Sequence, residues 1–223
     1  MTPILKPDGR LHLCADMVRR GSRLADIGTD HGYLPIALCL EGKIPSALAC
    51  DINPMPLKSA QENIARYGLS NKIQTRLSDG LKAVRPEETN DIAIAGMGGE
   101  LIRDILASAE WVKDETKKLI LQPMTHHEDL VLWLYENGFM ITAQKAAFDE
   151  GKYYTALSAC YTGEKRTHSL SFAVVGMLDL EEKVSRWFIR RCLQNYRNKS
   201  KGDPSFLRVV NDLEELLQRY EYQ

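Results

Sequence analysis

The sequence DIGTDHGY at residues 26–33 decides the fold of this chain, because it joins an apolar run to a helical pattern through two glycines. Glycines let the backbone turn sharply and approach a ligand closely. The first N–H groups of the following helix attract an anion such as a carboxylate or a phosphate. We therefore predict a ligand site at this turn. The alternative is a glycine turn that serves only to pack the strand against the helix.

The acidic residues around this turn indicate which cofactor is bound. Asp51 ends the next apolar run, where a carboxylate can accept both hydroxyls of a ribose. A dinucleotide site has the spacing G-x-G-x-x-G, whereas this chain has D-x-G-x-D-x-G. Asp26 and Asp30 would repel a pyrophosphate but suit the cationic S-adenosylmethionine. Asp79 follows the third run and can accept a hydrogen bond from the adenine amine. We predict S-adenosylmethionine as the cofactor.

Short apolar runs alternate with helical patterns from about residue 23 to residue 160. The runs are apolar on successive residues, as expected for parallel strands that helices cover on both faces. Strands are predicted at 23–28, 46–51, 73–77, 91–96 and 118–122, with a closing hairpin whose strands begin at Phe139 and Tyr153, and helices are predicted, for example, at 54–67 and 126–137. This order predicts the α/β class, with a doubly wound sheet closed by an antiparallel strand.

Two helical segments flank the predicted sheet. Residues 10–20 have amphipathic spacing, and we expect them to cap the sheet edge. After a linker at 163–169, apolar residues recur at steps of three and four in two runs, 173–187 and 206–220, with Gly-Asp-Pro at 202–204 between them. This pattern predicts an antiparallel, coiled-coil-like helical hairpin. We predict two domains, a cofactor-binding domain at 1–163 and a helical arm at 164–223.

The charge of the chain is balanced only on average. The 29 Lys and Arg against 30 Asp and Glu give a net charge of −1, which excludes a uniformly basic nucleic-acid binder. The stretch 183–201 nevertheless has no acidic residue and seven basic ones, Lys183, Arg186, Arg190, Arg191, Arg197, Lys199 and Lys201. Such a helix can follow a phosphate backbone. The alternative is a solvated face paired with Asp212, Glu214 and Glu215 of the return helix.

The chain resembles the bacterial tRNA (adenine(22)-N(1))-methyltransferase family along essentially its whole length. The resemblance rests on the runs ADIGTDHGYLP, ACDINPMPLKSAQENI, LSDGL, IAGMGGELI and LILQP, in this order and spacing. It implies a class I methyltransferase Rossmann-like domain with a C-terminal coiled-coil domain. It also implies methyl transfer from S-adenosylmethionine to N1 of an adenine in the tRNA D-loop. One position departs from the family pattern, because Met124 stands where an Asn is expected after Gln-Pro.

The chemistry predicts a role for each group of residues. The catalytic candidates are Asp30 and His31. Asp30 would stabilise the cationic product base, or it would only bind the donor's amino group. The alternative for His31 is a structural role. The predicted cofactor-binding residues are Asp26, Gly28, Asp30, Gly32, Asp51, Ile52, Ser78, Asp79, Gly80, Gly96 and Met97. The predicted substrate-binding residues are Gly98, Gly99, Gln122, Pro123, Tyr153, Lys183, Arg186, Arg190, Arg191 and Arg197. Gln122 could equally be a buried strand-end amide, and packing is favoured for Tyr153.

Several other kinds of protein are disfavoured. The His-His-Glu-Asp run at 126–129 lacks a sensibly spaced third metal ligand, so no metal is expected. The five scattered cysteines indicate reduced thiols and a cytoplasmic protein. No apolar stretch reaches a membrane span, and a monomer is favoured. The partner expected is tRNA. Two rival functions are a small-molecule methyltransferase and a non-catalytic nucleotide-binding or RNA-binding module.

Overall fold

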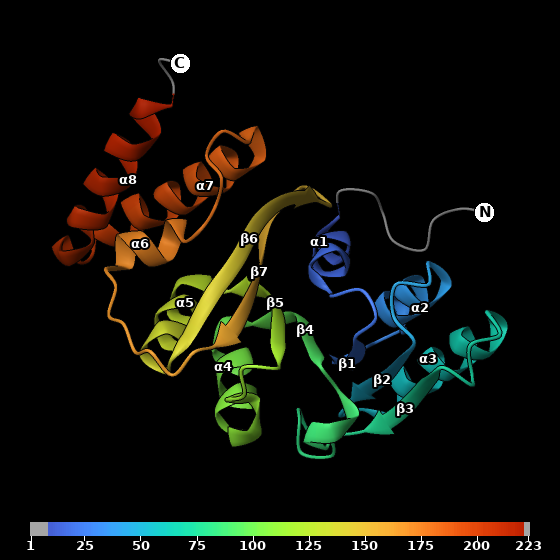
Figure 1. Ribbon diagram of the computed structural model, residues 1–223. Helices are drawn as coiled ribbons and strands as arrows, with labels where there is room; N and C mark the ends of the chain where they lie inside the picture. Colours follow the sequence, from blue (N-terminus) through green and yellow to red (C-terminus); the bar gives the residue numbers. More distant parts are fainter. Residues whose placement is uncertain (1–8, 221–223) are drawn as a thin grey trace.

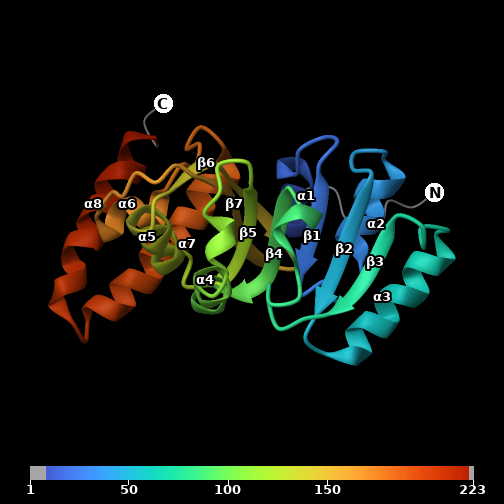
Figure 2. The same cartoon turned by 60° about the horizontal axis from the view of Figure 1, so that its bottom comes forward.

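A computed structural model describes residues 9–220, in which a sheet of seven strands is flanked by helices on both faces (Figure 1). The strands are β1 (Arg23–Ile27), β2 (Ser46–Asp51), β3 (Ile73–Leu77), β4 (Asp91–Gly98), β5 (Lys118–Thr125), β6 (Phe139–Asp149) and β7 (Lys152–Tyr161), in the order β3-β2-β1-β4-β5-β7-β6. Strands β1 to β5 pair in parallel, and β7 pairs antiparallel to both β5 and β6. The predicted doubly wound sheet and its closing antiparallel hairpin are confirmed. The sheet crosses the molecule from β3 toward helices α6 to α8 (Figure 2).

The helices are α1 (Arg10–Met17), α2 (Tyr33–Leu40), α3 (Pro54–Arg66), α4 (Gly99–Ala107), α5 (His127–Glu136), α6 (Leu170–Val175), α7 (Lys183–Ser200) and α8 (Leu207–Arg219), with short 3₁₀ turns at Pro86–Glu88, Glu110–Val112 and Pro204–Phe206. Neighbouring strand residues point to opposite faces. Ile92 and Ile94 pack with α4 and α5, whereas Ala93 packs with α1, α2 and α3. Two cores therefore cover the sheet, which explains the continuous apolar runs.

The N-terminal helix lies on a face of the sheet, so the expectation that it caps the edge was wrong. Helix α1 packs across β5, β7 and β6, and its Leu13 and Cys14 belong to one core with Ala147 and Ala156. Helix α1 lies on the face because its apolar surface is too wide for a sheet edge to cover. This placement brings the start of α1 next to the carboxyl ends of the strands.

The first C-terminal run is two helices instead of the predicted one. Helix α6 ends at Gly176, whose φ of +58° favours glycine, and an added Cβ there would overlap the Gln144 amide. Met177 and Trp187, which the pattern placed on the apolar stripe, are 52% and 42% exposed. The hairpin of α7 and α8 is confirmed, and its buried contacts are Phe188, Ile189, Leu193, Val210, Leu213 and Leu217.

A buried carboxylate joins this hairpin to the sheet region. The Tyr196 hydroxyl on α7 donates a 2.8 Å hydrogen bond to Glu128 at the start of α5, and the His127 ring lies 3.1 Å from the other Glu128 oxygen. The His127 Nε2 atom also lies 3.1 Å from the Val174 carbonyl oxygen. Burial alone would raise the pKa of Glu128, but its hydrogen bonds with His127 and Tyr196 prevail and hold it at about 2. Glu128 therefore sets the position of α7 relative to the sheet.

We predict that Tyr196→Phe lowers the free energy of unfolding by about 1–3 kcal/mol, because it removes a hydrogen bond from a buried carboxylate. Urea unfolding followed by circular dichroism measures the change. Tyr67→Phe is the matched control, since Tyr67 is 40% exposed, and it should leave stability unaltered. Equal stability of Tyr196→Phe and the unmodified protein would contradict the role given to Glu128.

Candidate functional site

The turn after β1 is shaped by positive φ angles and by one close side chain. Gly28 and Gly32 have φ angles of +76° and +73°, and Gly32 caps the start of α2. The Gly28 and Thr29 amides donate to the Cys50 carbonyl at 2.8 and 2.9 Å, which ties the turn to β2. An added Cβ on Gly28 would overlap the terminal methyl of Met97. The predicted cofactor residues Gly28 and Met97 therefore lie in contact distance, and the first must be glycine.

Asp26 is a buried carboxylate at this turn. The Thr29 hydroxyl donates a 2.6 Å hydrogen bond to its Oδ2 atom, and the residue is 5% exposed. Burial raises the pKa of Asp26, the Thr29 hydrogen bond partly opposes this rise, and the Asp51 charge adds to it, which together bring the pKa to about 6. An ionised Asp26 is thus destabilised in the empty protein, and a cation placed beside it would be bound favourably.

A cavity of about 260 Å³ opens beside this carboxylate and has both charge signs in its wall. Its lining includes Asp26, Gly28, Asp30, Gly96 and Arg10, the last from the start of α1. Arg10 was not among the predicted residues, because an arginine sixteen positions before the motif carries no recognisable signal. Only the packing of α1 on the sheet brings it here. An acidic and a basic wall suit a zwitterionic ligand group such as an amino acid.

Gln122 holds the Arg10 side chain in place. The Gln122 Oε1 atom accepts hydrogen bonds from Arg10 Nη1 and from the Gly96 amide, both at 3.1 Å, and its Nε2 atom donates to the Pro123 carbonyl at 3.0 Å. Gln122 has no exposed surface. This arrangement matches the buried strand-end amide that was the alternative to a base contact. Gln122 positions Arg10 and the Gly96 loop instead of reaching into the cleft.

The second and third strands supply an acidic and apolar rim. Asp51 is 9% exposed, and its Oδ1 atom accepts a hydrogen bond from the Asn53 amide at 2.8 Å. Ile52 and Leu77 are 58% and 59% exposed at the same strand ends, and Leu77 was not among the predicted residues. Exposed apolar side chains at strand ends are typical walls for a flat ligand. This rim therefore suits a nucleoside.

The loop after β3 uses its polar groups in two different ways. The Ser78 hydroxyl donates to the Gly80 carbonyl at 2.7 Å and accepts from the Ala83 amide at 3.1 Å, so it stabilises the loop itself. Asp79 is exposed and forms an ion pair with Lys82. Gly80, with a φ of +56°, lies against Ile105. Of Ser78, Asp79 and Gly80, Asp79 has the exposed side chain.

Asp30 and His31 lie together at the mouth of the cavity. The His31 Nε2 atom is 3.6 Å from Asp30 Oδ1, and the two side chains are 43% and 69% exposed respectively. The His31 ring lies 5.3 Å from the Tyr33 ring. Asp30 has a φ of +52°, which directs the chain around the turn. Both side chains are free to contact a substrate that enters the cleft.

The end of β4 approaches the start of α5 very closely. The register between β4 and β5 shifts on either side of Met97, and Gly98 pairs with Thr125. An added Cβ on Gly99 would overlap the His126 carbonyl. Gly99 is therefore needed for backbone packing, and Gly98 is left half-exposed at the surface of the cleft.

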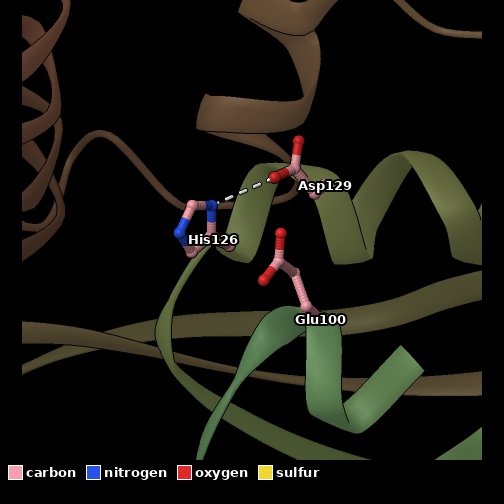
Figure 3. Close-up of side chains that lie close together, drawn as sticks. All are labelled: Glu100, His126 and Asp129. Atoms are coloured by element: carbon pink, nitrogen blue, oxygen red, sulfur yellow. Dashed lines mark hydrogen bonds and ion pairs between the residues drawn. The ribbon is translucent and has the colours of Figure 1, made fainter. Parts of the chain in front are cut away.

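Glu100, His126 and Asp129 also meet near this point, with ligand-type atoms within 4.8 Å of one another (Figure 3). The sequence lacked a third ligand for the histidine run, and the fold supplies Glu100 from α4. All three side chains are exposed, and His126 Nδ1 already lies 3.2 Å from Asp129 Oδ2. Exposed groups of this kind are common without an ion. The cluster therefore adds negative charge where α4 and α5 begin, and we assign no metal ion to it.

A groove of about 860 Å³ separates these strand ends from α7. It is bordered by Thr125 and His126 on one side, Lys152 and Tyr153 on the hairpin, and Arg191 and Lys199 on the helix. Helix α7 and the hairpin of β6 and β7 therefore form two walls of one depression that begins at the end of β5.

Some basic side chains of α7 are already bonded to other groups of the protein, and others are exposed to solvent. Arg197 bonds Glu214 at 3.0 and 2.7 Å, as the solvated-face alternative proposed. Asp212 accepts from Ser171 instead, and Glu215 pairs with Arg219. Arg186 donates to two carbonyl groups at the start of the helix. Lys183 and Arg191 are exposed, and the Arg190 guanidinium lies 4.9 Å over the Trp187 ring.

Known proteins resemble this chain both in sequence and in structure. A family profile described as "Methyltransferase domain" matches residues 8–157. The tRNA (adenine(22)-N(1))-methyltransferase of Bacillus subtilis is 36% identical over 155 residues, which is 70% of this chain and 65% of that protein. Streptococcus pneumoniae Sp1610, a candidate tRNA (m1A22) methyltransferase solved with S-adenosyl-L-methionine, is 33% identical over 93% of this chain and 98% of its own, with a TM-score of 0.84. The chain belongs to the tRNA (adenine(22)-N(1))-methyltransferase family.

The likeness to this family extends through the C-terminal helices. The B. subtilis m1A22 tRNA methyltransferase TrmK has 27% identity and a TM-score of 0.73, with 96% of this chain and 97% of TrmK covered. The family's Rossmann-like fold is thus present here together with its helical hairpin. Among the helices of residues 9–220, none has the length and apolarity needed to cross a membrane.

We predict that Asp26→Asn stabilises the ligand-free protein at pH 7 by up to about 3 kcal/mol. The pKa of Asp26 rises from 3.8 to about 6 on folding, so the native state binds a proton more tightly than the unfolded state. The stability of the unmodified protein should therefore increase as pH falls from 6 to 3.8, and the advantage of the variant should disappear near pH 4.

Urea unfolding at pH 7, 5.5 and 4.5 measures this difference. Asp104→Asn is the control, because the Asp104 side chain is 63% exposed on α4, and it should change stability little at any of these pH values. A loss of stability in Asp26→Asn at pH 7 would show that the ionised carboxylate stabilises the empty cleft.

Proposed function

We propose that this protein transfers a methyl group from S-adenosylmethionine to N1 of adenine 22 in tRNA. The observation that carries the proposal is the cavity beside the Gly28 turn, where Asp26 and Arg10 present opposite charges to a zwitterionic ligand. The whole-chain likeness to the S-adenosylmethionine complex of Sp1610 supports it. Residues 1–163 would supply the donor site and residues 164–223 the grip on tRNA.

The donor would lie across the carboxyl ends of β1 to β4. Its amino group and sulfonium are cationic and suit Asp26 and Asp30, and its ribose hydroxyls suit Asp51. Ile52 would pack on the adenine ring, and Asp79 would accept from the adenine amine. Gly28 and Gly32 leave room for the donor, with Gly80, Gly96 and Met97 completing the wall. The charges of the site therefore match each end of the donor separately.

The donor's carboxylate would bind Arg10. This guanidinium lies in the cavity that also contains Asp26, so a carboxylate and an amino group on one carbon can each meet an opposite charge. Gln122 fixes its orientation through the 3.1 Å hydrogen bond. Arginine is suited to this task, because its planar fork matches both carboxylate oxygens.

The methyl transfer needs no covalent enzyme intermediate. The lone pair on adenine N1 forms a bond to the methyl carbon while the carbon–sulfur bond breaks, and its electrons return to sulfur. The donor becomes neutral and the base becomes cationic. Orientation of N1 along the methyl–sulfur axis supplies most of the acceleration. Asp30 at the cleft mouth would stabilise the cationic base, and His31 would hold that carboxylate.

The tRNA would bind between the cleft and α7. Gly98 lets a flat base approach the end of β4, and the groove between Thr125 and Arg191 leads away from it. Lys183, Arg190 and Arg191 would contact phosphates. Arg186 and Arg197 are engaged within the protein, so their contribution is weaker. Pro123 shapes the end of β5, and Met124 offers no hydrogen-bond donor to the base.

The direct test incubates the protein with labelled S-adenosylmethionine and an unmodified tRNA transcript, followed by primer extension. Methylation at N1 blocks base pairing, so we expect label in the tRNA and a stop at position 22. A transcript with guanine at position 22 should stay unlabelled, and Asp30→Ala should abolish turnover. Label transfer only to small molecules would favour the rival methyltransferase function, and no transfer would overturn the proposal.

A second test concerns Arg10. Arg10→Ala should weaken S-adenosylmethionine binding at least about tenfold, because it removes a charge-assisted hydrogen bond. Binding of decarboxylated S-adenosylmethionine, which lacks the carboxylate, should not change. Isothermal titration calorimetry measures both. Arg20→Ala, an exposed residue at the far end of β1, is the control. Equal weakening of both donors would overturn the assignment and leave the methyltransferase activity unaffected.

A further inference from the structure

Three aromatic side chains, two of them exposed and the middle one half-buried, form a row outside the donor cavity. Phe148 at the end of β6 lies 4.8 Å from Tyr153 on β7, measured between ring centroids. Tyr153 lies 6.4 Å from Trp187 on α7, and these two rings are nearly parallel, at 13°. Phe148 is 54% exposed and Trp187 is 42% exposed. We call Phe148, Tyr153 and Trp187 the aromatic row.

Segments far apart in the chain build this row. The long hairpin of β6 and β7 curves away from the sheet, and its tip lies between α1 and α7 (Figure 1). Trp187 lies on α7 beside the buried Phe188, and it faces the hairpin instead of the core between α7 and α8. Three large aromatic rings that remain solvent-accessible at one place mark a binding surface more often than a packing defect.

The row links the donor cavity to the basic helix. Phe148 precedes Asp149, whose Oδ2 atom accepts a hydrogen bond from the Arg10 amide at 3.4 Å. Arg10 in turn lines the donor cavity. Tyr153, the middle ring, borders the groove that contains Lys152 and Arg191. The row therefore extends from the hairpin segment that contacts Arg10 to the groove beside α7.

The chemistry of the row selects the kind of partner. Flat rings stack on any nucleobase whatever its identity, because every base has a π face. Lys152 and Arg191 are exposed cations on the two walls of the groove that Tyr153 borders, and they complement a phosphate backbone. Bases in a duplex are already stacked on their neighbours, whereas unpaired bases are available. The row therefore fits single-stranded RNA better than a helix.

We propose that the aromatic row stacks the unpaired nucleotides that flank the target adenine and so holds the loop open over the donor cavity. This inference rests on the proposed function, since it names how the same site recognises its RNA. It adds a stacking surface on Phe148 and Trp187 to the phosphate contacts of α7. The row binds RNA without reading its sequence, and the donor cavity selects the methylated base.

The test compares Trp187→Ala, Phe148→Ala and Trp187→Phe with the unmodified full-length protein. Both alanine variants should raise the KM for unmodified tRNA about tenfold or more, with the dissociation constant for S-adenosylmethionine unaltered. Trp187→Phe keeps a stacking ring and should retain most of the affinity. Leu207→Ala is the matched control, because Leu207 is an equally exposed apolar residue, 49% exposed, on the other helix of the hairpin.

A binding assay separates stacking from charge. Fluorescence anisotropy with a single-stranded RNA and a duplex of equal length should show that Trp187→Ala weakens binding to the single strand and leaves duplex binding unaltered. Equal weakening for both RNAs, or unaltered KM in both alanine variants, would overturn the row's role. In that case the unmodified protein would still methylate tRNA. If the proposed function itself were wrong, the unmodified protein would not methylate tRNA.

Discussion

The tight turn after β1 is the constraint on which the rest of the structure depends. Gly28 must adopt a positive φ, and its missing Cβ leaves space that the Met97 methyl occupies. The ends of β1 and β4 lie side by side because the two strands pair in parallel. Gly32 is the N-cap of α2, and Tyr33 and Leu34 from its first turn line the same cavity. Any larger residue at Gly28 would be strained at this positive φ and would have to displace the Met97 methyl.

Electrostatics then decide what this cavity can hold. A carboxylate with a raised pKa, such as Asp26, lowers the stability of the empty protein. In the proposed function a cationic donor would offset this cost, and Arg10 would meet the donor's opposite charge. Stability and ligand binding therefore oppose each other at Asp26, which is common at functional sites. The Gln122 Oε1 atom accepts from both the guanidinium and the Gly96 amide, which fixes the position of Arg10 in the cavity wall.

The buried Glu128 plays the corresponding role for the C-terminal helices. It anchors Tyr196 and thereby places α7 along the groove that begins at β5. The same placement brings Trp187 against the hairpin of β6 and β7. A rigid attachment of α7 means that the spacing between the donor cavity and the basic helix is set before RNA arrives, so less ordering is needed on binding.

The sequence by itself determined the doubly wound sheet with its closing strand hairpin, the glycine turn with its acidic partners Asp26 and Asp51, and the helical hairpin. These follow from local rules, because hydrophobic periodicity, φ preferences and charge act between near neighbours in the chain. Only the tertiary structure decided that α1 lies on the sheet face, that Arg10 reaches the cavity, that Gln122 is buried, and that Tyr153 meets Trp187. The contacts of Arg10 join residues 112 and 139 positions apart, and their geometry depends on how whole elements pack, which no local pattern encodes.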